Sequence, residues 1–202
     1  MNEVPDMIPE KVSGKHLDLH AEVSRTTAVE AADLFQNARM RLLLPSLWHT
    51  LAGSLSAVFA LATPGNTDGG RTVKLHDYVT IDIPGPGNSL GDGFDWTQVT
   101  ALAEDVLAGA QKSVALTLTA CANPLNIVQD TAHFFDNSSS SSFVLYLSGC
   151  NVGIDYYGRN EQPNRHTISI ADNMRNALVA TGAAAGLSEL QWSSLIRGIL
   201  NT

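Results

Sequence analysis

Two polar loops hold most of the side chains in this chain that could bind a ligand. The loop at 84–95 reads PGPGNSLGDGFD and the loop at 158–166 reads GRNEQPNRH, and each follows an apolar, strand-like run. Strand ends that open into polar loops are common positions for binding groups. We predict that the two loops lie near each other and form a ligand-binding site. Its members are Asp92, Asp95, Trp96, Tyr157, Arg159, Asn160 and Glu161.

The first loop has the composition of a rigid turn. Proline fixes φ and glycine permits positive φ, so the backbone has a defined path. The loop lacks the Lys and the following apolar helix with which a phosphate-binding loop holds its ligand. Oxygen atoms of Asn88, Asp92 and Asp95 would suit a calcium ion, but their spacing does not match an EF-hand. We interpret the loop as an architectural joint or a recognition edge.

The second loop carries both signs of charge within a few residues. Arg159 and Glu161 are two positions apart. In an extended strand their side chains would therefore face the same way, where they could pair with a neighbouring strand. The alternative is an ordinary surface loop before a helix that begins near Ser169.

One further group of residues could bind a metal. His133 lies between Asp130 and Asp136 in DTAHFFDN, and on a helix the three would share one face. The two phenylalanines beside His133 indicate a core segment instead, so we predict neither a metal site nor a cofactor. No nucleophile motif such as GxSxG is present. For Cys121 and Cys150 two interpretations stay open, buried free thiols or a disulfide.

Composition narrows the classes of partner. The 202 residues carry a formal net charge of −8, whereas a nucleic-acid backbone requires a surplus of Lys and Arg. Residues 42–63 have no formal charge and the length of a membrane span, but Pro45 and several polar residues interrupt the run. We predict core segments there and no membrane association. The N-terminus lacks the basic-then-apolar order of a secretory signal, so we expect a cytoplasmic protein.

Helical spacing occurs towards both ends of the chain. Thr27 and Glu30 form a capping box for a helix that extends to about Leu43. Near the C-terminus, helices that begin at about Ser169 and Ser188 would form a hairpin. Segment 99–112 fits a helix as well as a strand.

Short runs with alternating polarity fill the middle of the chain, and they are too closely spaced for parallel crossovers. The expected strands are 54–62, 73–83, 95–103, 113–121, 142–148 and 151–157. The predicted fold class is α+β: an antiparallel sheet or small barrel of about six strands, with an N-terminal helix and a C-terminal helical hairpin. We expect residues 1–23 to form an N-terminal arm and residues 24–202 a single domain.

Two motifs, DYVTIDIPGPGNSLGDGFDW and FVLYLSGCNVGIDYYGRNEQPN, cover about a fifth of the chain. Together they resemble an uncharacterised group of bacterial proteins, chiefly from Bacteroidetes. The resemblance implies that both loops belong to one domain type. It implies no activity and no catalytic residues.

Three classes of function stay open. The acidic charge and the two shaped loops favour a bacterial interaction or assembly component without enzymatic activity, which binds a protein partner or a second copy of the chain. The alternative is a small-ligand-binding module with a pocket near the 84–95 and 158–166 loops. The third is a metal-dependent hydrolase that uses Asp92, Asp95, His133 or Glu161. The sequence supports an enzyme less well than a binding protein.

Overall fold

The structure, a computed structural model, describes residues 7–53, 56–62, 70–83, 88–127, 130–164 and 187–201. Its centre is a seven-stranded antiparallel sheet in the order β1-β7-β6-β5-β4-β3-β2. The strands are β1 (Lys15–Ser24), β2 (Val58–Ala62), β3 (Tyr78–Asp82), β4 (Asp95–Glu104), β5 (Lys112–Ala120), β6 (Ser140–Ser148) and β7 (Asn151–Glu161). The predicted α+β class with an antiparallel sheet is therefore confirmed.

The sheet is open, with β1 and β2 at its two edges in the described part of the chain. The sequence predicts about six strands, and the seventh is β1. Residues 15–23, expected in an arm, belong to this strand, which pairs with β7 along its length. Exposed Asp18, His20 and Glu22 alternate with less exposed apolar residues, as on an edge strand with one face in solvent.

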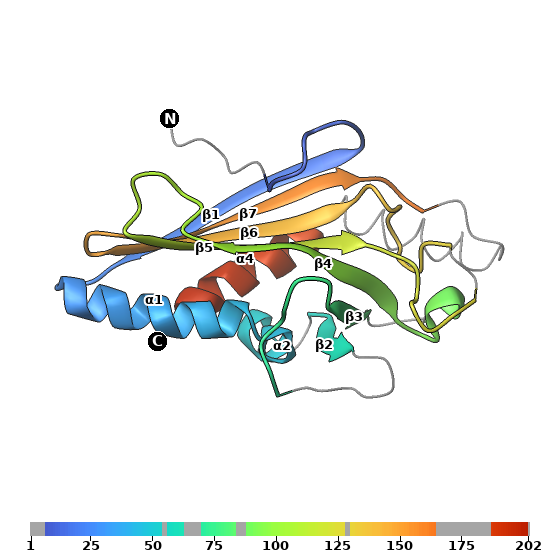
Figure 1. The fold of residues 1–202 in the computed structure, drawn as a ribbon, viewed down its shortest axis with the longest axis horizontal. Helices are drawn as coiled ribbons and strands as arrows, with labels where there is room; N and C mark the ends of the chain where they lie inside the picture. The colour runs from blue at the N-terminus through green and yellow to red at the C-terminus, as the bar shows by residue number, and fades with distance from the viewer. Residues whose placement is uncertain are drawn as a thin grey trace.

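The helices lie on one face of the sheet, which we call the inner face (Figure 1). They are α1 (Ala28–Leu42), α2 (Trp48–Ala52) and α4 (Leu187–Leu200), with single turns η1 (Pro45–Leu47) and η2 (Ser89–Gly91). Thr27 and Glu30 form the predicted capping box at the start of α1. The other helix of the expected C-terminal hairpin falls on residues outside the described ranges.

The uncharged stretch at 42–63 is divided among several elements. It contains the end of α1, then η1 and α2, and finally β2. Trp48 is fully buried in the core. No helix among the described residues is long and apolar enough to cross a membrane.

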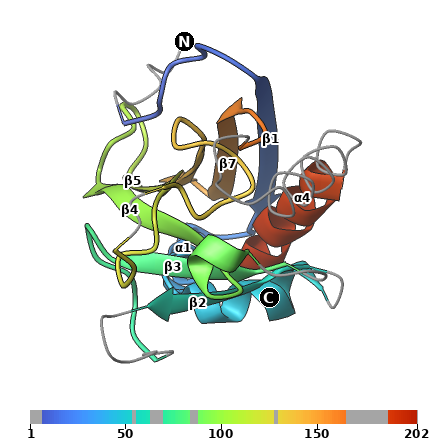
Figure 2. The same ribbon diagram turned by 90° about the vertical axis from the view of Figure 1, so that its right-hand side faces the viewer.

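The core between the sheet and the helices contains a connected group of five aromatic side chains. Trp48 packs on Phe59 and Phe143, with ring centroids 5.1 and 5.3 Å apart. Trp192 of α4 stacks on Tyr156 of β7 at 4.9 Å and 21°. Since α4 also packs against β1, β7, α1 and α2, this helix joins an edge strand of the sheet to the other helices (Figure 2).

Several element boundaries differ from those that the alternation predicts. The ambiguous segment 99–112 continues β4 to Glu104 and then forms a turn before β5. Residues 73–77, expected as strand, precede β3 as a turn in which His76 has a φ of 72°. At the other extreme, β7 continues four residues beyond its predicted end, from Tyr157 to Glu161. This extension contains Arg159 and Glu161 of the second predicted loop.

Candidate functional site

The two predicted loops leave the same end of the sheet, where β4 begins and β7 ends. The connection between β5 and β6, residues 121–139, lies between them. It contacts the first loop's side through the backbone N–H of Trp96, which donates to the carbonyl of Ala132 (2.7 Å). It contacts the second through the N–H of Asp136, which donates to the carbonyl of Gln162 (3.0 Å). The loops are thus bridged by a third segment.

The polar groups of the first loop are engaged with one another. The side-chain amide of Asn88 donates to Asp95 at 3.1 Å, and both residues are fully buried. The amide of Asn123, from the β5–β6 connection, donates to Asp92 at 3.1 Å. These bonds hold a turn in which Asp92 has a φ of 54°. The role of Asn88, Asp92 and Asp95 is therefore architectural, and we do not retain the calcium hypothesis.

Trp96 lies away from the second loop's charged residues and packs at the side of the first loop. Its indole N–H donates to the carbonyl of Gly91 at 3.0 Å, and its ring lies 6.4 Å from that of Tyr78. A Cβ on Gly91 would lie 3.0 Å from the indole, so a side chain there would require the ring to shift. Trp96 thus anchors the turn.

His133 is buried, and its Nδ1 accepts the backbone N–H of Phe135 at 3.0 Å. Asp136 instead accepts the N–H of Ser138. Among the described residues, no three His, Cys, Asp or Glu side chains are grouped closely enough to hold a metal. The hypothesis of a metal site at Asp130, His133 and Asp136 gains no support.

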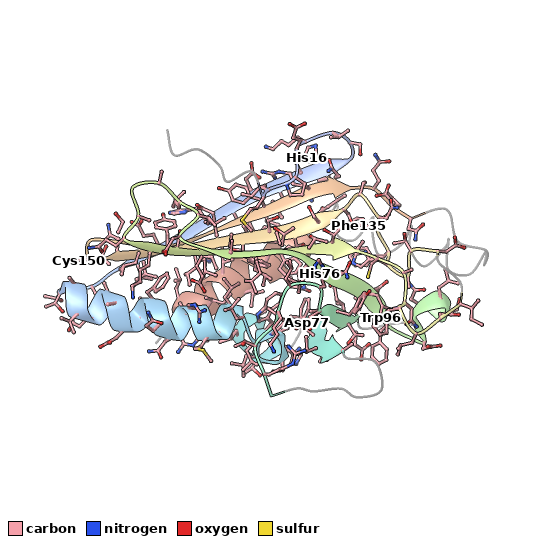
Figure 3. All side chains as sticks on the ribbon, in the orientation of Figure 1. His16, His76, Asp77, Trp96, Phe135 and Cys150 are labelled. Atoms are coloured by element: carbon pink, nitrogen blue, oxygen red, sulfur yellow. The ribbon has the colours of Figure 1, made fainter. Side chains whose placement is uncertain are left out.

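The two cysteines are free thiols. Cys121 follows β5, and its backbone N–H donates to Trp96 at the loop end of the sheet. Cys150 lies in the β6–β7 turn at the opposite end, far from Trp96 and Phe135 in Figure 3. Of the two interpretations, the disulfide is wrong. Burial raises the pKa of the Cys121 thiol to about 12, which makes it a poor nucleophile.

A β-bulge near the end of β7 separates the charged residues of the second loop. Leu17 pairs with Gly158, but Lys15, two residues away on β1, pairs with Glu161, three residues away on β7. The extra residue on β7 shifts the alternation by one. Asn160 absorbs the change with a left-handed φ of 56°. The prediction that Arg159 and Glu161 face the same way is therefore wrong, because it assumes a regular strand.

Arg159 points to the outer face. Its guanidinium donates to Asp18 and to the carbonyl of Gly158, and it lies 5.0 Å from the ring centre of Tyr157. Partial burial alone would raise the pKa of Asp18, but the hydrogen bonds from Lys11 and Arg159 outweigh it and lower that pKa. Tyr157 packs there against a cluster that includes Ile8 and Val144. Arg159 and Tyr157 form an outer-face structural group.

Asn160 ties the bulge to the N-terminal segment. Its side-chain carbonyl accepts the backbone N–H groups of Val12 (2.9 Å) and Ser13 (3.1 Å), and its amide donates to the carbonyl of Glu10 (3.1 Å). Asparagine tolerates a left-handed φ better than most residues. These three bonds hold it there, so the bulge is a built feature of the fold.

Glu161 points to the inner face. A Cβ on Gly158 would lie 2.8 Å from Glu161 Oε1 and 3.2 Å from the hydroxyl of Tyr156, so the glycine leaves room for the carboxyl group. The residue is 7% exposed, and in the part of the chain that the structure describes its Oε2 has no hydrogen-bond partner. Burial raises the pKa of Glu161 to about 7, although the charge of Lys15 acts to lower it.

The hydroxyl group of Tyr156 lies near this carboxyl group, and Ser141 and Trp192 both contact Tyr156. Tyr156 Oη lies 3.1 Å from Ser141 Oγ, on the neighbouring strand β6. Burial, and next the charge of Glu161, raises the pKa of Tyr156 well above its ordinary value, so the phenol keeps its proton. Trp192 stacks on Tyr156 and, like Ser141, is only partly buried. We call Ser141, Tyr156, Glu161 and Trp192 the inner-face cluster.

Of the seven predicted binding residues, only Glu161 belongs to this cluster. Asp92, Asp95 and Trp96 shape the first loop, Tyr157 and Arg159 lie on the outer face, and Asn160 forms the bulge. The sequence pattern misses Ser141, Tyr156 and Trp192. Tyr156 and Trp192 have apolar neighbours at alternate or helical spacing, which places both residues on core faces. Only the hydroxyl group of Tyr156 and the indole N–H of Trp192 indicate a polar role.

No protein-family model and no curated protein matches the chain. Similar solved structures include the major latex-like protein 151 of Panax ginseng, with 12% identity, 85% of this chain and 96% of that chain covered, and a TM-score of 0.36. Ara h 8.0201 has 9% identity and a TM-score of 0.34, and the match covers 93% of this chain and 100% of that chain. Truncated norcoclaurine synthase of Thalictrum flavum has 12% identity and a TM-score of 0.33, and the match covers 91% of this chain and 95% of that chain. Likenesses at this level carry no argument about function.

Proposed function

We propose that the protein is a small-ligand-binding module whose site is the inner-face cluster. The observation that carries the proposal is the carboxyl group of Glu161, which is buried beside Tyr156 and whose Oε2 has no hydrogen-bond partner among the described residues. An unpaired buried carboxyl group costs folding free energy. Yet Asn160 and Gly158 hold it on the inner face instead of letting it point to solvent. A bound molecule that donates to Oε2 would offset this cost.

The rest of the cluster has the composition of a small-molecule site, which is mostly apolar with a few convergent polar groups. Trp192, Tyr156 and Phe143 form aromatic contacts of 4.9 to 5.8 Å with one another. The hydroxyls of Ser141 and Tyr156 add two polar groups beside the carboxyl group. Trp192 and Ser141 are partly exposed, so a ligand can reach the cluster at these residues.

The test is binding of a neutral aromatic probe, N-phenyl-1-naphthylamine, followed by its fluorescence. We expect saturable binding that Trp192→Leu weakens at least several-fold, because the indole ring is a wall of the site. Leu190→Ser is the matched control on the same helix, since Leu190 is 66% exposed. Absence of saturable binding, or equal loss in both variants, would contradict the proposed function.

The leading expectation from the sequence is an interaction or assembly component, but the residues of the two loops give it little support. It rests on two shaped polar loops as recognition edges, but Asp92, Asp95 and Arg159 are committed to contacts within the chain. A metal-dependent hydrolase likewise loses Asp92, Asp95 and His133 as candidate ligands, because each has a hydrogen bond within the chain. The ligand-binding module is therefore the function we carry forward.

A further inference from the structure

We propose that the ligand of the inner-face cluster is an organic amine, an aromatic or apolar molecule that carries one protonated amino group. This inference rests on the proposed function and adds the chemical class of the ligand. It comes from the separation of charges at the bulge and from the groups that surround Glu161 Oε2.

The bulge keeps Arg159 away from Glu161. In a regular strand, Arg159 and Glu161 would share a face and could form an ion pair. Here Arg159 lies on the outer face with Asp18, and Glu161 lies on the inner face. Lys15, its pairing partner on β1, is a cation that acts on it, but Oε2 has no hydrogen-bond partner among the residues that the structure describes. An acidic site of this kind favours a cation over an anion.

The neighbouring groups match the needs of an ammonium group. An ammonium has three N–H donors and no acceptor. Around it would stand Glu161 Oε2, Ser141 Oγ and Tyr156 Oη, each able to accept. Aromatic faces attract cations, most strongly that of tryptophan, and Trp192 stacks beside Tyr156. The remaining aromatic core would suit the apolar body of the molecule.

The ionisable groups around the site determine the direction in which ligand affinity should change with pH. Lys15 from β1 and Tyr156 from β7 act on Glu161 or are acted on by it, while β6 contributes the neutral hydroxyl of Ser141 and α4 contributes Trp192. An ammonium ligand binds the ionised carboxylate. Its affinity should therefore rise with pH through the neutral range, by about tenfold between pH 6 and pH 8. A ligand with a carbonyl group would need the protonated acid and would show the opposite slope.

Calorimetry with the full chain tests this, with 2-phenylethylamine against the equally sized neutral 2-phenylethanol. We expect the amine to bind at least tenfold more tightly at pH 8 and to lose about tenfold at pH 6. Glu161→Gln should abolish both the preference and the pH dependence while the neutral naphthylamine probe still binds. Glu22→Gln, at an exposed position of β1, should change neither.

Two results would overturn the inference. One is equal affinity for the amine and the alcohol, and the other is amine affinity that falls as pH rises from 6 to 8. If the naphthylamine probe binds in either case, the proposed function stands and only the amine is wrong. If neither probe nor amine binds the wild-type chain, the site itself is wrong.

Discussion

Glu161 is the residue on which the account depends. Its position is unfavourable for the isolated fold, because the carboxyl group is buried against an aromatic core and its Oε2 has no hydrogen-bond partner among the described residues. Residues of this kind are often retained for binding or catalysis rather than for stability. The effect of Glu161 on stability is therefore measurable in the absence of any ligand.

Glu161→Gln should stabilise the protein at alkaline pH. The folded-state pKa of about 7 lies above the ordinary value of 4.5. Stability that depends on the protonated form is therefore complete below pH 4.5 and lost as pH rises through 7. The glutamine of the variant never ionises. Relative to the wild-type protein, the free energy of unfolding of the variant should therefore rise by about 3 kcal/mol more at pH 8 than at pH 4.5. Urea denaturation at the two pH values measures this gain.

Glu22→Gln serves as the control for this measurement, because Glu22 is exposed on the same sheet. Its change in unfolding free energy should be within about 0.5 kcal/mol at both pH values. If Glu161→Gln gives the same small change as Glu22→Gln, the buried and unpaired carboxyl group is contradicted.

Residue types indicate part of this site but not its geometry. Glu161 stands among the residues that the polar sequence GRNEQPN singles out, and it is a member of the proposed site. The period-two rule nevertheless assigns it to the wrong side, with Arg159. No local pattern marks a bulge at Asn160, because the bulge depends on hydrogen bonds to residues 10–13, about 150 positions away in the chain.

At the scale of elements, the bulge in β7 is a joint between the N-terminal segment and the inner-face cluster. Asn160→Gly keeps the left-handed φ but loses three hydrogen bonds, so it should cost about 1–3 kcal/mol of unfolding free energy. Asn160→Ala should cost about 1 kcal/mol more, because alanine resists that conformation. Both variants should also weaken binding of 2-phenylethylamine, as Glu161 loses its fixed position. Urea denaturation and calorimetry measure the two effects.

Asp105 is the matched control, because it has the same left-handed φ of 55° in the turn that follows β4, at the opposite end of the sheet. Asp105→Ala should be less stable than Asp105→Gly by a similar amount, without any change in affinity for 2-phenylethylamine. Equal stability of the two Asn160 variants, or unchanged amine binding in both, would show that the bulge does not position the site.

Elements that carry local signals are the ones that the sequence predicts well. α1 carries a capping box and a continuous apolar stripe, both local signals, and the structure contains both. The sequence does not predict β1, because the polar residues His16, Asp18, His20 and Glu22 are typical of an exposed arm. Its partner is β7, which lies more than a hundred residues later in the chain. Pairing at that distance leaves little trace in the local composition.

At the scale of the whole molecule, α4 holds the cluster together. The helix supplies Trp192, and at Gly198 it approaches α2 so closely that a Cβ would collide with the backbone of Leu51. Gly198→Ala should therefore displace the helix and lower the unfolding free energy by about 2–3 kcal/mol. Probe binding should weaken as well, because Trp192 moves relative to Tyr156. Ser194→Ala, at an exposed position of the same helix, should change stability by less than about 0.5 kcal/mol.

If Gly198→Ala and Ser194→Ala are equally stable, close packing of α4 on α2 is wrong. If Gly198→Ala is destabilised but binds the probe with unchanged affinity, α4 is a structural element only and Trp192 does not form a wall of the site. Either result would require a different place for the ligand.

Long-range topology also decides how the predicted loops are arranged. The sequence gives no reason to expect that residues 121–139 lie between the 84–95 and 158–166 loops, yet strand order places them there. The two loops therefore share one end of the sheet without pooling their polar residues. The seven residues predicted to form a common site do not lie together. A ligand site at that end of the sheet remains a proposal, and it depends on Glu161.

The most direct test is an NMR titration of the Glu161 side-chain carboxyl carbon in the full chain, with and without 2-phenylethylamine. The account predicts a pKa near 7 in the free protein, and a lower pKa when the amine is bound, because the cation stabilises the carboxylate. A pKa close to the ordinary 4.5 in the free protein would contradict the buried, unpaired carboxyl group. A pKa near 7 that the amine leaves unchanged would contradict an amine ligand.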